Sequence, residues 1–337
     1  MLKYFVLFFF SFIAGTFLTR KVMKLAVKHD AVDKPTHRKV HRSIIPLWGG
    51  IAIYLSFFLT IAFYCLFSMI SSHIWSSSLS INHFSLGRKL FGLFAGGGIL
   101  IILGAVDDKW GLPPKLKLLG QIIAVAVVII FDVRILGFTI PVLGKYLGFH
   151  YIISVLITLV WIVAIINSMN FIDGLDGLAG GIAFIACLSF FALAIFKSPS
   201  SGYLFAGKVS YFVGIISITL AGSILAFLRF NFNPARIFMG DCGSQFLGLM
   251  MASLSIIGSY KGITAFTLFT PVLVLTIPIF DIVFAVYRRW RRHVPISKAD
   301  KSHLHHRLLA LGLTQKQAVT FLYIISILFS GLAIILA

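Results

Sequence analysis

Long apolar segments alternate with short polar ones along almost the whole chain. A helix of about 17–25 apolar residues can cross a bilayer, so these segments predict membrane-spanning helices. We place ten of them, at residues 2–19, 48–70, 89–106, 118–131, 148–166, 178–196, 209–228, 244–259, 263–286 and 319–336. The fourth is short and could extend through 132–140, and the eighth and ninth would form a tight pair. The pattern predicts an all-α, polytopic membrane protein with about ten transmembrane helices, built as a single domain over residues 1–337.

Composition supports a membrane protein. The chain is 59% hydrophobic and 12% charged, whereas a soluble domain is about 45–50% apolar and about 25% charged. The net charge of +19 does not indicate nucleic acid as a partner, because the basic residues lie between apolar runs. The three cysteines show no paired spacing and predict no disulfide framework. The first apolar run lacks a small-residue cleavage site, so we expect a retained helix rather than a signal peptide.

The basic residues also predict the orientation of the chain. Alternation through ten helices places residues 20–47, 107–117, 167–177, 229–243 and 287–318 on one side. These loops hold 21 of the 29 Lys and Arg residues. The positive-inside rule assigns that side to the cytoplasm, with membrane lipids around the helices and both termini outside.

The acidic residues predict where the chemistry lies. All ten are aspartates, and a carboxylate near hydrocarbon costs several kcal/mol unless it is paired, metal-bound or hydrated. Six lie inside or at the ends of apolar runs, namely Asp107, Asp108, Asp173, Asp176, Asp241 and Asp281. The first five fall in predicted cytoplasmic loops, and Asp281 lies about one and a half turns before another. We therefore expect an active-site cleft on the cytoplasmic face.

The pair Asp107-Asp108 is followed by Lys115 and Lys117. Adjacent carboxylates repel each other and need a cation or a proton nearby. Their hard oxygens suit Mg²⁺, particularly where substrate phosphates complete its shell, and the lysines could hold phosphate. The alternative is an ordinary helix end with capping aspartates.

Residues 167–181 carry Asn170, Asp173 and Asp176. The three side chains could line one helical face. Alternatively, the two Asp-Gly steps indicate a turned segment in which backbone approaches a ligand. A calcium loop is not indicated, because the twelve-residue spacing and the terminal Glu are missing.

Residues 231–244 contain Pro234 and two glycines, which predict irregular backbone at the membrane face. Such backbone is tolerated where it lines a cavity. Asp241 is a candidate metal ligand, and Phe238 could either stack on a base or anchor the packing. Cys242 is a poor partner for Mg²⁺ and is interpreted as packing.

The sequence His-Leu-His-His-Arg occupies residues 303–307, after a run of four arginines at 288–292. The histidines could bind Zn²⁺, but arginine, lysine and histidine together suit a diphosphate better. The arginine run is interpreted as a topology and lipid-headgroup feature. The basic loop of Lys34, Arg38 and His41 is interpreted similarly, and Pro46 with Gly49-Gly50 indicates a shaped start for the second helix.

These motifs together resemble the polyprenyl-phosphate N-acetylhexosamine-1-phosphate transferase family, of glycosyltransferase 4 type. The matching features are Asp107-Asp108 with its downstream lysines, Asn-Phe-Ile-Asp-Gly-Leu-Asp-Gly-Leu-Ala at 170–179, Phe-Met-Gly-Asp-Cys-Gly-Ser at 238–244, and the motif at 303–307. The resemblance implies a Mg²⁺- or Mn²⁺-dependent enzyme of the bacterial cytoplasmic membrane, often a homodimer. Such enzymes move a sugar 1-phosphate from a UDP-sugar to undecaprenyl phosphate and release UMP.

The resemblance also implies roles for individual residues. The implied catalytic carboxylates are Asp107, Asp108, Asp173 and Asp241. The implied metal ligands are Asp241, Asn170 and Asp173. The implied uracil contacts are Asp176 and Phe238. The implied phosphate and sugar contacts are Lys115, Lys117, His303, His305, His306 and Arg307, with Lys34, Arg38 and His41 towards the lipid phosphate.

The motif at 303–307 resembles the branch that uses UDP-N-acetylglucosamine. The branch that uses UDP-MurNAc-pentapeptide for peptidoglycan usually carries three consecutive histidines followed by an acid, and Leu304 and Arg307 depart from that pattern. The expected product would initiate a cell-surface polysaccharide such as teichoic acid or the O-antigen of lipopolysaccharide. The alternatives are the pentapeptide donor, another N-acetylated UDP-hexosamine, and an ion-coupled transporter. A transporter is disfavoured because the acids lie near one face and no repeat is evident.

Overall fold

The computed structural model describes residues 1–35, 43–74, 84–139, 146–196, 204–258, 272–291 and 304–336. Its helices are α1 (Leu2–Lys28), α2 (Gly49–Ile74), α3 (Phe84–Trp110), α4 (Pro114–Ile130), α5 (Tyr151–Ile172), α6 (Leu178–Phe196), α7 (Leu204–Asn231), α8 (Gly240–Gly258), α10 (Thr276–Arg291), α11 (Leu304–Ala310) and α12 (Gln315–Leu336). The strands are β1 (Val32–Asp33), β2 (Ile45–Pro46), β3 (Gly137–Thr139) and β4 (Tyr146–Gly148). Both two-stranded sheets are antiparallel, and Val32 pairs with Pro46 and Phe138 with Leu147. The mainly helical class is confirmed, with these two short sheets added.

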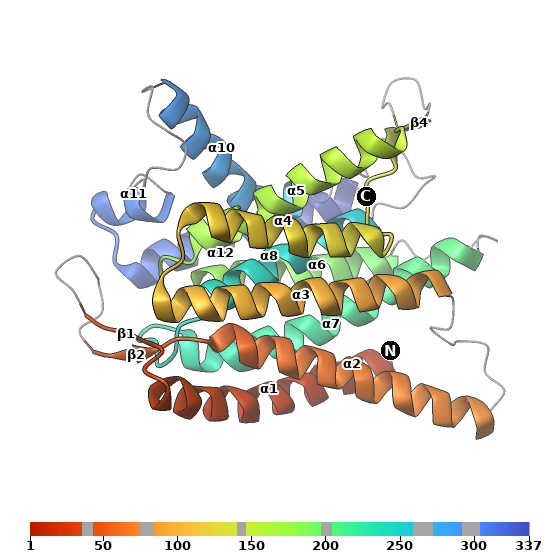
Figure 1. The fold of residues 1–337 in the computed structure, drawn as a ribbon, viewed down its shortest axis with the longest axis horizontal. Helices are drawn as coiled ribbons and strands as arrows, with labels where there is room; N and C mark the ends of the chain where they lie inside the picture. The colour runs from red at the N-terminus through yellow and green to blue at the C-terminus, as the bar shows by residue number, and fades with distance from the viewer. Residues whose placement is uncertain are drawn as a thin grey trace.

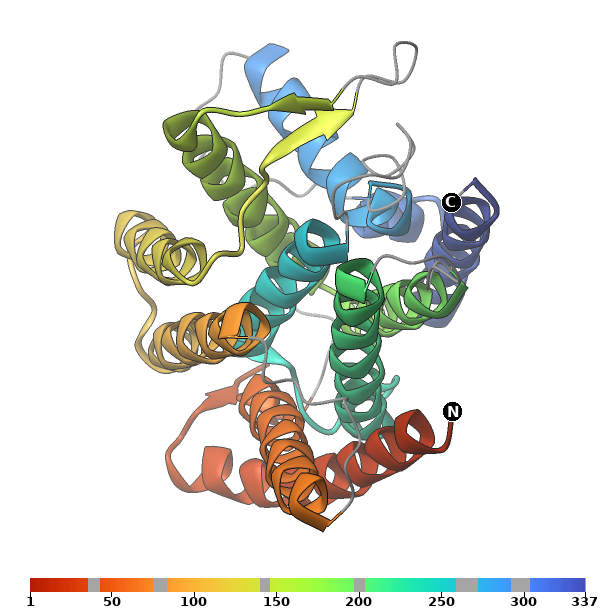
Figure 2. The same ribbon diagram turned by 90° about the vertical axis from the view of Figure 1, so that its right-hand side faces the viewer.

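The helix α8 forms the centre of the molecule. It packs against α2, α3, α5, α6 and α7, and Figures 1 and 2 show it enclosed by these neighbours. Every residue from Cys242 to Ser255 is buried. A helix that is enclosed on all sides can hold its first turn in a fixed position, and that turn begins at Gly240.

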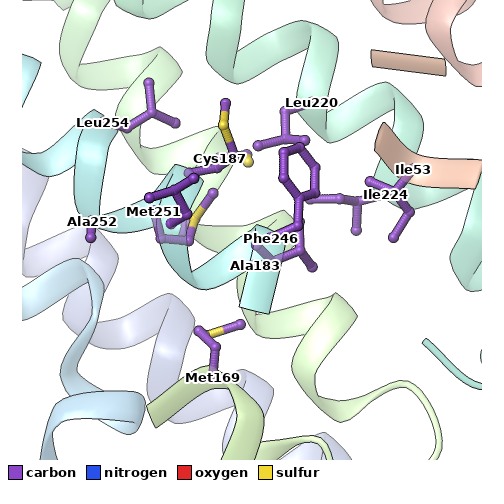
Figure 3. Packing of buried hydrophobic residues seen from close by; sticks show 14 of the residues in the cluster. Ile53, Met169, Ala183, Cys187, Leu220, Ile224, Phe246, Met251, Ala252 and Leu254 are labelled. Atoms are coloured by element: carbon purple, nitrogen blue, oxygen red, sulfur yellow. The ribbon is translucent and has the colours of Figure 1, made fainter. Parts of the chain in front are cut away.

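The core surrounds α8. Phe246 and Met251 of α8 gather in one cluster with Leu220 of α7, Ile53 of α2 and Cys187 of α6 (Figure 3). Helices in lipid associate through van der Waals packing and close backbone approach rather than through a hydrophobic driving force. The first turn of α8 shows such an approach, because a Cβ atom at Gly50 would overlap the Gly243 backbone.

Seven of the described helices are long and apolar enough to cross a membrane, which supports a polytopic membrane protein. They are Leu2–Lys28, Gly49–Ser68, Leu86–Trp110, Tyr151–Ile172, Leu178–Phe196, Gly207–Asn231 and Gln315–Leu336. The count of ten stays a prediction, because residues 259–271, which include the link between the eighth and ninth predicted helices, lie outside the described residues. The extension of the fourth helix through 132–140 is wrong. α4 ends at Ile130, Asp132 adopts a φ of 70°, and residues 137–139 form β3.

Several helices continue beyond the apolar runs that predict them, as α1 does to Lys28 and α3 to Trp110. Hydropathy follows the side chains, whereas the helical backbone also continues through charged residues, of which Lys and Arg are good helix formers. The turns that link α3 to α4 and α7 to α8 lie at one end of the bundle, together with β1 and β2 (Figure 1). Which side of a membrane each end faces stays a prediction.

Candidate active site

The first turn of α8 is held by a carboxylate from α3. The backbone N–H of Asp241 donates to Asp108 Oδ1 over 2.7 Å, and the N–H of Cys242 donates to Oδ2 over 3.5 Å. The start of a helix leaves such N–H groups without helical partners and favours negative charge. Asp108 therefore caps α8 and fixes the backbone of Asp241.

Gly240 begins α8 with a φ of +74°. A Cβ atom at this position would also overlap the Asp108 carboxylate. Only glycine adopts this conformation at little cost and leaves room for the capping side chain. The Gly-Asp step of the motif is thus required by the local geometry.

The ammonium of Lys117 on α4 lies among three oxygen atoms. It pairs with Asp107 Oδ2 at 3.0 Å, with Asp241 Oδ2, and with Asn170 Oδ1 at 3.5 Å. Asp107 Oδ1 accepts a hydrogen bond from the N–H of Leu112 over 2.6 Å, which also fixes the turn between α3 and α4. Hard oxygen donors from three helices thus converge on one cationic position.

Asn170 comes from the last turn of α5. Its amide nitrogen donates to Asp241 Oδ1 over 2.7 Å and to Ser244 Oγ over 2.9 Å. These bonds join α5 to the first turn of α8. Asn170 and Asp241, which lie far apart in the sequence, are therefore direct neighbours.

Asp173 follows the end of α5 and is partly buried. Burial, together with the negative charges of Asp241, Asp108 and Asp176, raises the pKa of Asp173 to about 8. A carboxyl group in this position needs either a proton or additional positive charge nearby. Residues 173–177 form a turn rather than a helix, so the turned segment is the correct one of the two interpretations.

The turn that contains Asp176 is tied to the segment between α7 and α8. Asp176 Oδ2 accepts hydrogen bonds from Asn233 Nδ2 over 2.9 Å and from the N–H of Ala235 over 3.0 Å. The hydroxyl of Tyr323 on α12 donates to the Gly177 carbonyl over 2.5 Å. These contacts hold the turn beside residues 232–239, whose irregular backbone agrees with the prediction from Pro234.

Phe238 lies at the end of that segment and is half-buried. Its N–H donates to the Pro46 carbonyl over 2.8 Å, and its carbonyl accepts from the N–H of Gly49 over 3.0 Å. The predicted shaped start of the second helix is confirmed, because α2 begins at Gly49 directly after β2 and Trp48, whose φ is 72°.

The other predicted site residues are less closely associated with this cluster. Lys115 is exposed on the first turn of α4, and Lys34 forms an exposed pair with Asp30 at 3.3 Å. His306 and Arg307 are exposed on α11. Arg38, His41, His303 and the side chain of His305 lie outside the described part of the chain.

The interpretation of the arginine run needs one correction. Arg289 is only 7% exposed, and its guanidinium carbon lies 5.9 Å from the centroid of the Phe171 ring. A buried guanidinium stacked on an aromatic ring is an internal contact rather than a headgroup contact. The spacing of arginines along a helix does not by itself show which one faces inward.

The donor set fits a hard divalent cation. In the described residues no three His, Cys, Asp or Glu side chains gather into a closed metal site, but Mg²⁺ usually takes only one or two carboxylates and completes its shell with water and phosphates. Asp241, Asn170 and Asp107 already surround a positive charge, that of Lys117. The thiol of Cys242 is buried and donates to the Met239 carbonyl over 3.5 Å, in agreement with a packing role.

Sequence reasoning missed a buried amide network beside Asn170. Asn167 Nδ2 donates to Gln121 Oε1 over 2.9 Å, and Gln121 Nε2 donates to Gln245 Oε1 over 3.2 Å. The network links α5, α4 and α8 immediately next to Asn170 and Ser244. The available signal was the occurrence of Gln121 and Gln245 within segments that are otherwise apolar.

The chain is similar to known proteins over most or all of its length. The family model described as "Glycosyl transferase family 4" matches residues 90–259. A Bacillus subtilis protein named probable undecaprenyl-phosphate N-acetylglucosaminyl 1-phosphate transferase is 36% identical over 336 residues, covering 100% of this chain and 86% of its own length. A Mycolicibacterium smegmatis decaprenyl-phosphate N-acetylglucosaminephosphotransferase is 33% identical, over 91% of this chain and 76% of its own. An Escherichia coli undecaprenyl-phosphate alpha-N-acetylglucosaminyl 1-phosphate transferase is 27% identical, over 95% and 79%.

Proposed function

We propose that this chain, which belongs to glycosyl transferase family 4, transfers N-acetylglucosamine 1-phosphate to undecaprenyl phosphate. The product is undecaprenyl-diphosphate-N-acetylglucosamine, the first lipid-linked intermediate of a cell-surface polysaccharide. The names of the Bacillus subtilis and Escherichia coli relatives support this acceptor and this sugar.

UDP-N-acetylglucosamine is the proposed donor. Leu304 and Arg307 stand where the pentapeptide branch usually has a histidine and an acid, and the relatives' names all specify N-acetylglucosamine. An arginine suits a compact, doubly charged sugar diphosphate. Residues 303–307, Lys117 and Lys115 are the proposed phosphate contacts, while Asp176 and Phe238 are proposed at the uracil.

The reaction is a phosphoryl transfer. An oxygen of the lipid phosphate forms a bond to the β-phosphorus of the donor, and the bond between that phosphorus and the bridging oxygen breaks, so that UMP leaves with the bridging oxygen. Enzymes catalyse such transfers mainly by positioning and by stabilising charge. A covalent aspartyl-phosphate route would instead exchange UMP with the donor in the absence of lipid acceptor.

The residues of this chain supply the positioning. Asp108 holds the backbone of Asp241, and Asn170 holds its carboxylate. The ammonium of Lys117 can move from Asp107 to an incoming phosphate, because its stem is flexible and its ammonium is a compact point charge. Asp107, thus released, is the carboxylate we assign to orient the lipid phosphate or to accept its residual proton.

Mg²⁺, or Mn²⁺ in its place, would be held by Asp241 and Asn170 with Asp173 beside them, and would neutralise charge on the diphosphate and on the departing UMP. We further propose a bacterial cytoplasmic membrane location, with the site on the cytoplasmic face. There the nucleotide sugar arrives from the cytosol and the lipid from the bilayer. A homodimer also remains our expectation.

The observation that carries the proposal is the junction of four separate helices at Asp241. Its contacts to Asp108, Lys117 and Asn170 join α3, α4, α5 and α8. The test uses purified protein in detergent with undecaprenyl phosphate, Mg²⁺ and a panel of radiolabelled UDP-sugars, read by thin-layer chromatography.

Radiolabelled lipid should form from UDP-N-acetylglucosamine, with stoichiometric UMP, and should fail to form with Asp241→Ala or with EDTA. The Asp241→Ala protein should remain folded, so its elution from size exclusion should be unchanged. Product formed only from UDP-MurNAc-pentapeptide would contradict the proposal that UDP-N-acetylglucosamine is the donor. Full activity of Asp241→Ala would overturn the assignment of the site.

A further inference from the structure

Asp281 is a buried carboxylate on α10. Its side chain is 2% exposed, and its Oδ1 accepts a hydrogen bond from the backbone N–H of Leu304 over 2.9 Å. Leu304 is the first residue of α11. A buried carboxylate costs several kcal/mol unless hydrogen bonds or opposite charge compensate it. This bond therefore ties the middle of α10 to the first turn of α11.

The helix α11 is short and has two different faces. Leu304 and Leu308 pack against the hydrophobic core, whereas His306 and Arg307 are exposed. A helix of seven residues is not stable on its own, because nucleation costs more than so few hydrogen bonds return. The direction in which Arg307 points thus depends on the leucine packing and on the bond at Leu304.

The same helix α10 also contacts the motif at the end of α5. α10 packs along α5, and the buried guanidinium of Arg289 lies 5.9 Å from the centroid of the Phe171 ring. Phe171 directly follows Asn170, which bonds to Asp241. One helix is therefore in contact with both Asn170's segment and α11, at the end of the bundle where the turns gather (Figure 1).

We propose that Asp281 is a positioning residue for the transfer reaction. It holds the first turn of α11 so that His306 and Arg307 stay at a fixed place relative to Asn170 and Asp241. The inference rests on the proposed function, in which residues 303–307 contact the sugar diphosphate. Asp281 itself does not touch the substrate, and it acts through the backbone of α11.

The test compares substitutions that keep and remove the acceptor oxygen. Asp281→Asn retains an oxygen at the same position, whereas Asp281→Leu removes it and leaves the N–H of Leu304 without its partner. Val283→Ala is the matched control, because Val283 is an exposed residue of the same helix. All variants are made in the full chain and purified in detergent.

Hydrogen exchange measures directly whether the Asp281 carboxylate holds the first turn of α11. Asp281→Leu should raise the exchange rate of peptides covering 304–310 by about tenfold or more, while peptides from α8 stay unchanged. Asp281→Asn and Val283→Ala should remain within about threefold of wild type. This measurement does not depend on activity, so it tests the Asp281–Leu304 hydrogen bond even if the proposed substrate is wrong.

Kinetics test the positioning role. Asp281→Leu should raise the KM for UDP-N-acetylglucosamine about tenfold and the Kd for UMP less, because UMP keeps only one of the two phosphates and its proposed uracil contacts lie elsewhere. Arg307→Ala should then cost much less in the Asp281→Leu background than in wild type, because residues that act through the same backbone segment couple in a double-mutant cycle. Rescue by Asp281→Asn would separate positioning from a general structural defect.

Three results would overturn the proposal. They are unchanged exchange of α11 in Asp281→Leu, equal loss in Asp281→Asn and Asp281→Leu, and additive effects with Arg307→Ala. If Asp281→Leu does not fold, Leu304→Ala, which loses the leucine packing but keeps the N–H, is compared with Leu304→Pro, which also removes the N–H donor, since proline is tolerated in the first turn of a helix. Relative to Leu304→Ala, Leu304→Pro should raise the donor KM in the same way, and equal KM values in the two variants would also refute the inference.

Discussion

Replacing Asp108 tests how the site is assembled. In the structure this carboxylate accepts one good hydrogen bond from Asp241, at 2.7 Å, and one long bond from Cys242, at 3.5 Å. Asp108→Ala removes both bonds and the negative charge at the start of α8. Asp108→Asn keeps an oxygen for Asp241 but loses the charge.

The size of the effect follows from these two bonds. A hydrogen bond to a charged group contributes about 1.5–3 kcal/mol, and replacing a helix cap with alanine costs about 0.5–2 kcal/mol. The long bond adds little, so we expect Asp108→Ala to destabilise the first turn of α8 by about 2 kcal/mol of free energy. If that loss falls wholly on the transition state, turnover drops about 30-fold.

Two measurements on each variant distinguish capping from proton transfer. If Asp108 caps α8, Asp108→Ala should lower both the melting temperature and turnover, and Asp108→Asn should fall between it and wild type. Lys109→Ala, at the next and exposed position of α3, is the control and should match wild type. Complete loss of turnover in both Asp108 variants at an unchanged melting temperature would contradict the capping role and favour proton transfer.

Further predictions concern neighbouring residues. Lys117→Met leaves two carboxylates without their cation, so in the absence of divalent cations it should lower the stability by about 1–3 kcal/mol, and the melting temperature with it. Mg²⁺ should restore more stability to this variant than it adds to wild type. Equal Mg²⁺-induced shifts of the melting temperature in the two proteins would contradict this. Gly240→Ala should cost about 1–2 kcal/mol in backbone strain and should also displace the Asp108 carboxylate. Its turnover should therefore fall well below that of the control Gly312→Ala, because Gly312 has a positive φ but open space around it. Equal turnover of the two variants would argue against the clash with Asp108. Phe238→Ala should weaken UMP binding about fivefold or more, because a lost stacking contact costs about 1–3 kcal/mol. An unchanged UMP Kd by calorimetry would exclude stacking.

The sequence predicts the membrane-spanning helices and the positions of the motifs because large free energies govern where apolar runs and aspartates can lie. Apolar runs of helical length have few alternatives to burial, and aspartates at their ends are costly unless they are used. The two Asp-Gly steps at 173–174 and 176–177 also indicate the turn that the structure shows, because glycine following a polar residue favours tight turns.

The separate roles of Asp107 and Asp108 could not be predicted from the sequence. Adjacent residues on a helix point about 100° apart, so one carboxylate faces Lys117 and the other faces the start of α8. Which is which depends on how α3 packs against α8. The burial of Arg289 and the bond from Asp281 to α11 are likewise set by tertiary packing, which leaves no local pattern in the chain.

We propose that Asp107-Asp108, Asn170-Asp173 and the 238–241 segment meet around one divalent cation. Fe²⁺ bound in place of Mg²⁺ cleaves nearby backbone when ascorbate and peroxide are added, and mass spectrometry locates the cuts. We expect cuts within all three segments, suppressed by excess Mg²⁺ and lost in Asp241→Ala. Cuts confined to one segment, or cuts that persist in Asp241→Ala, would contradict the shared site.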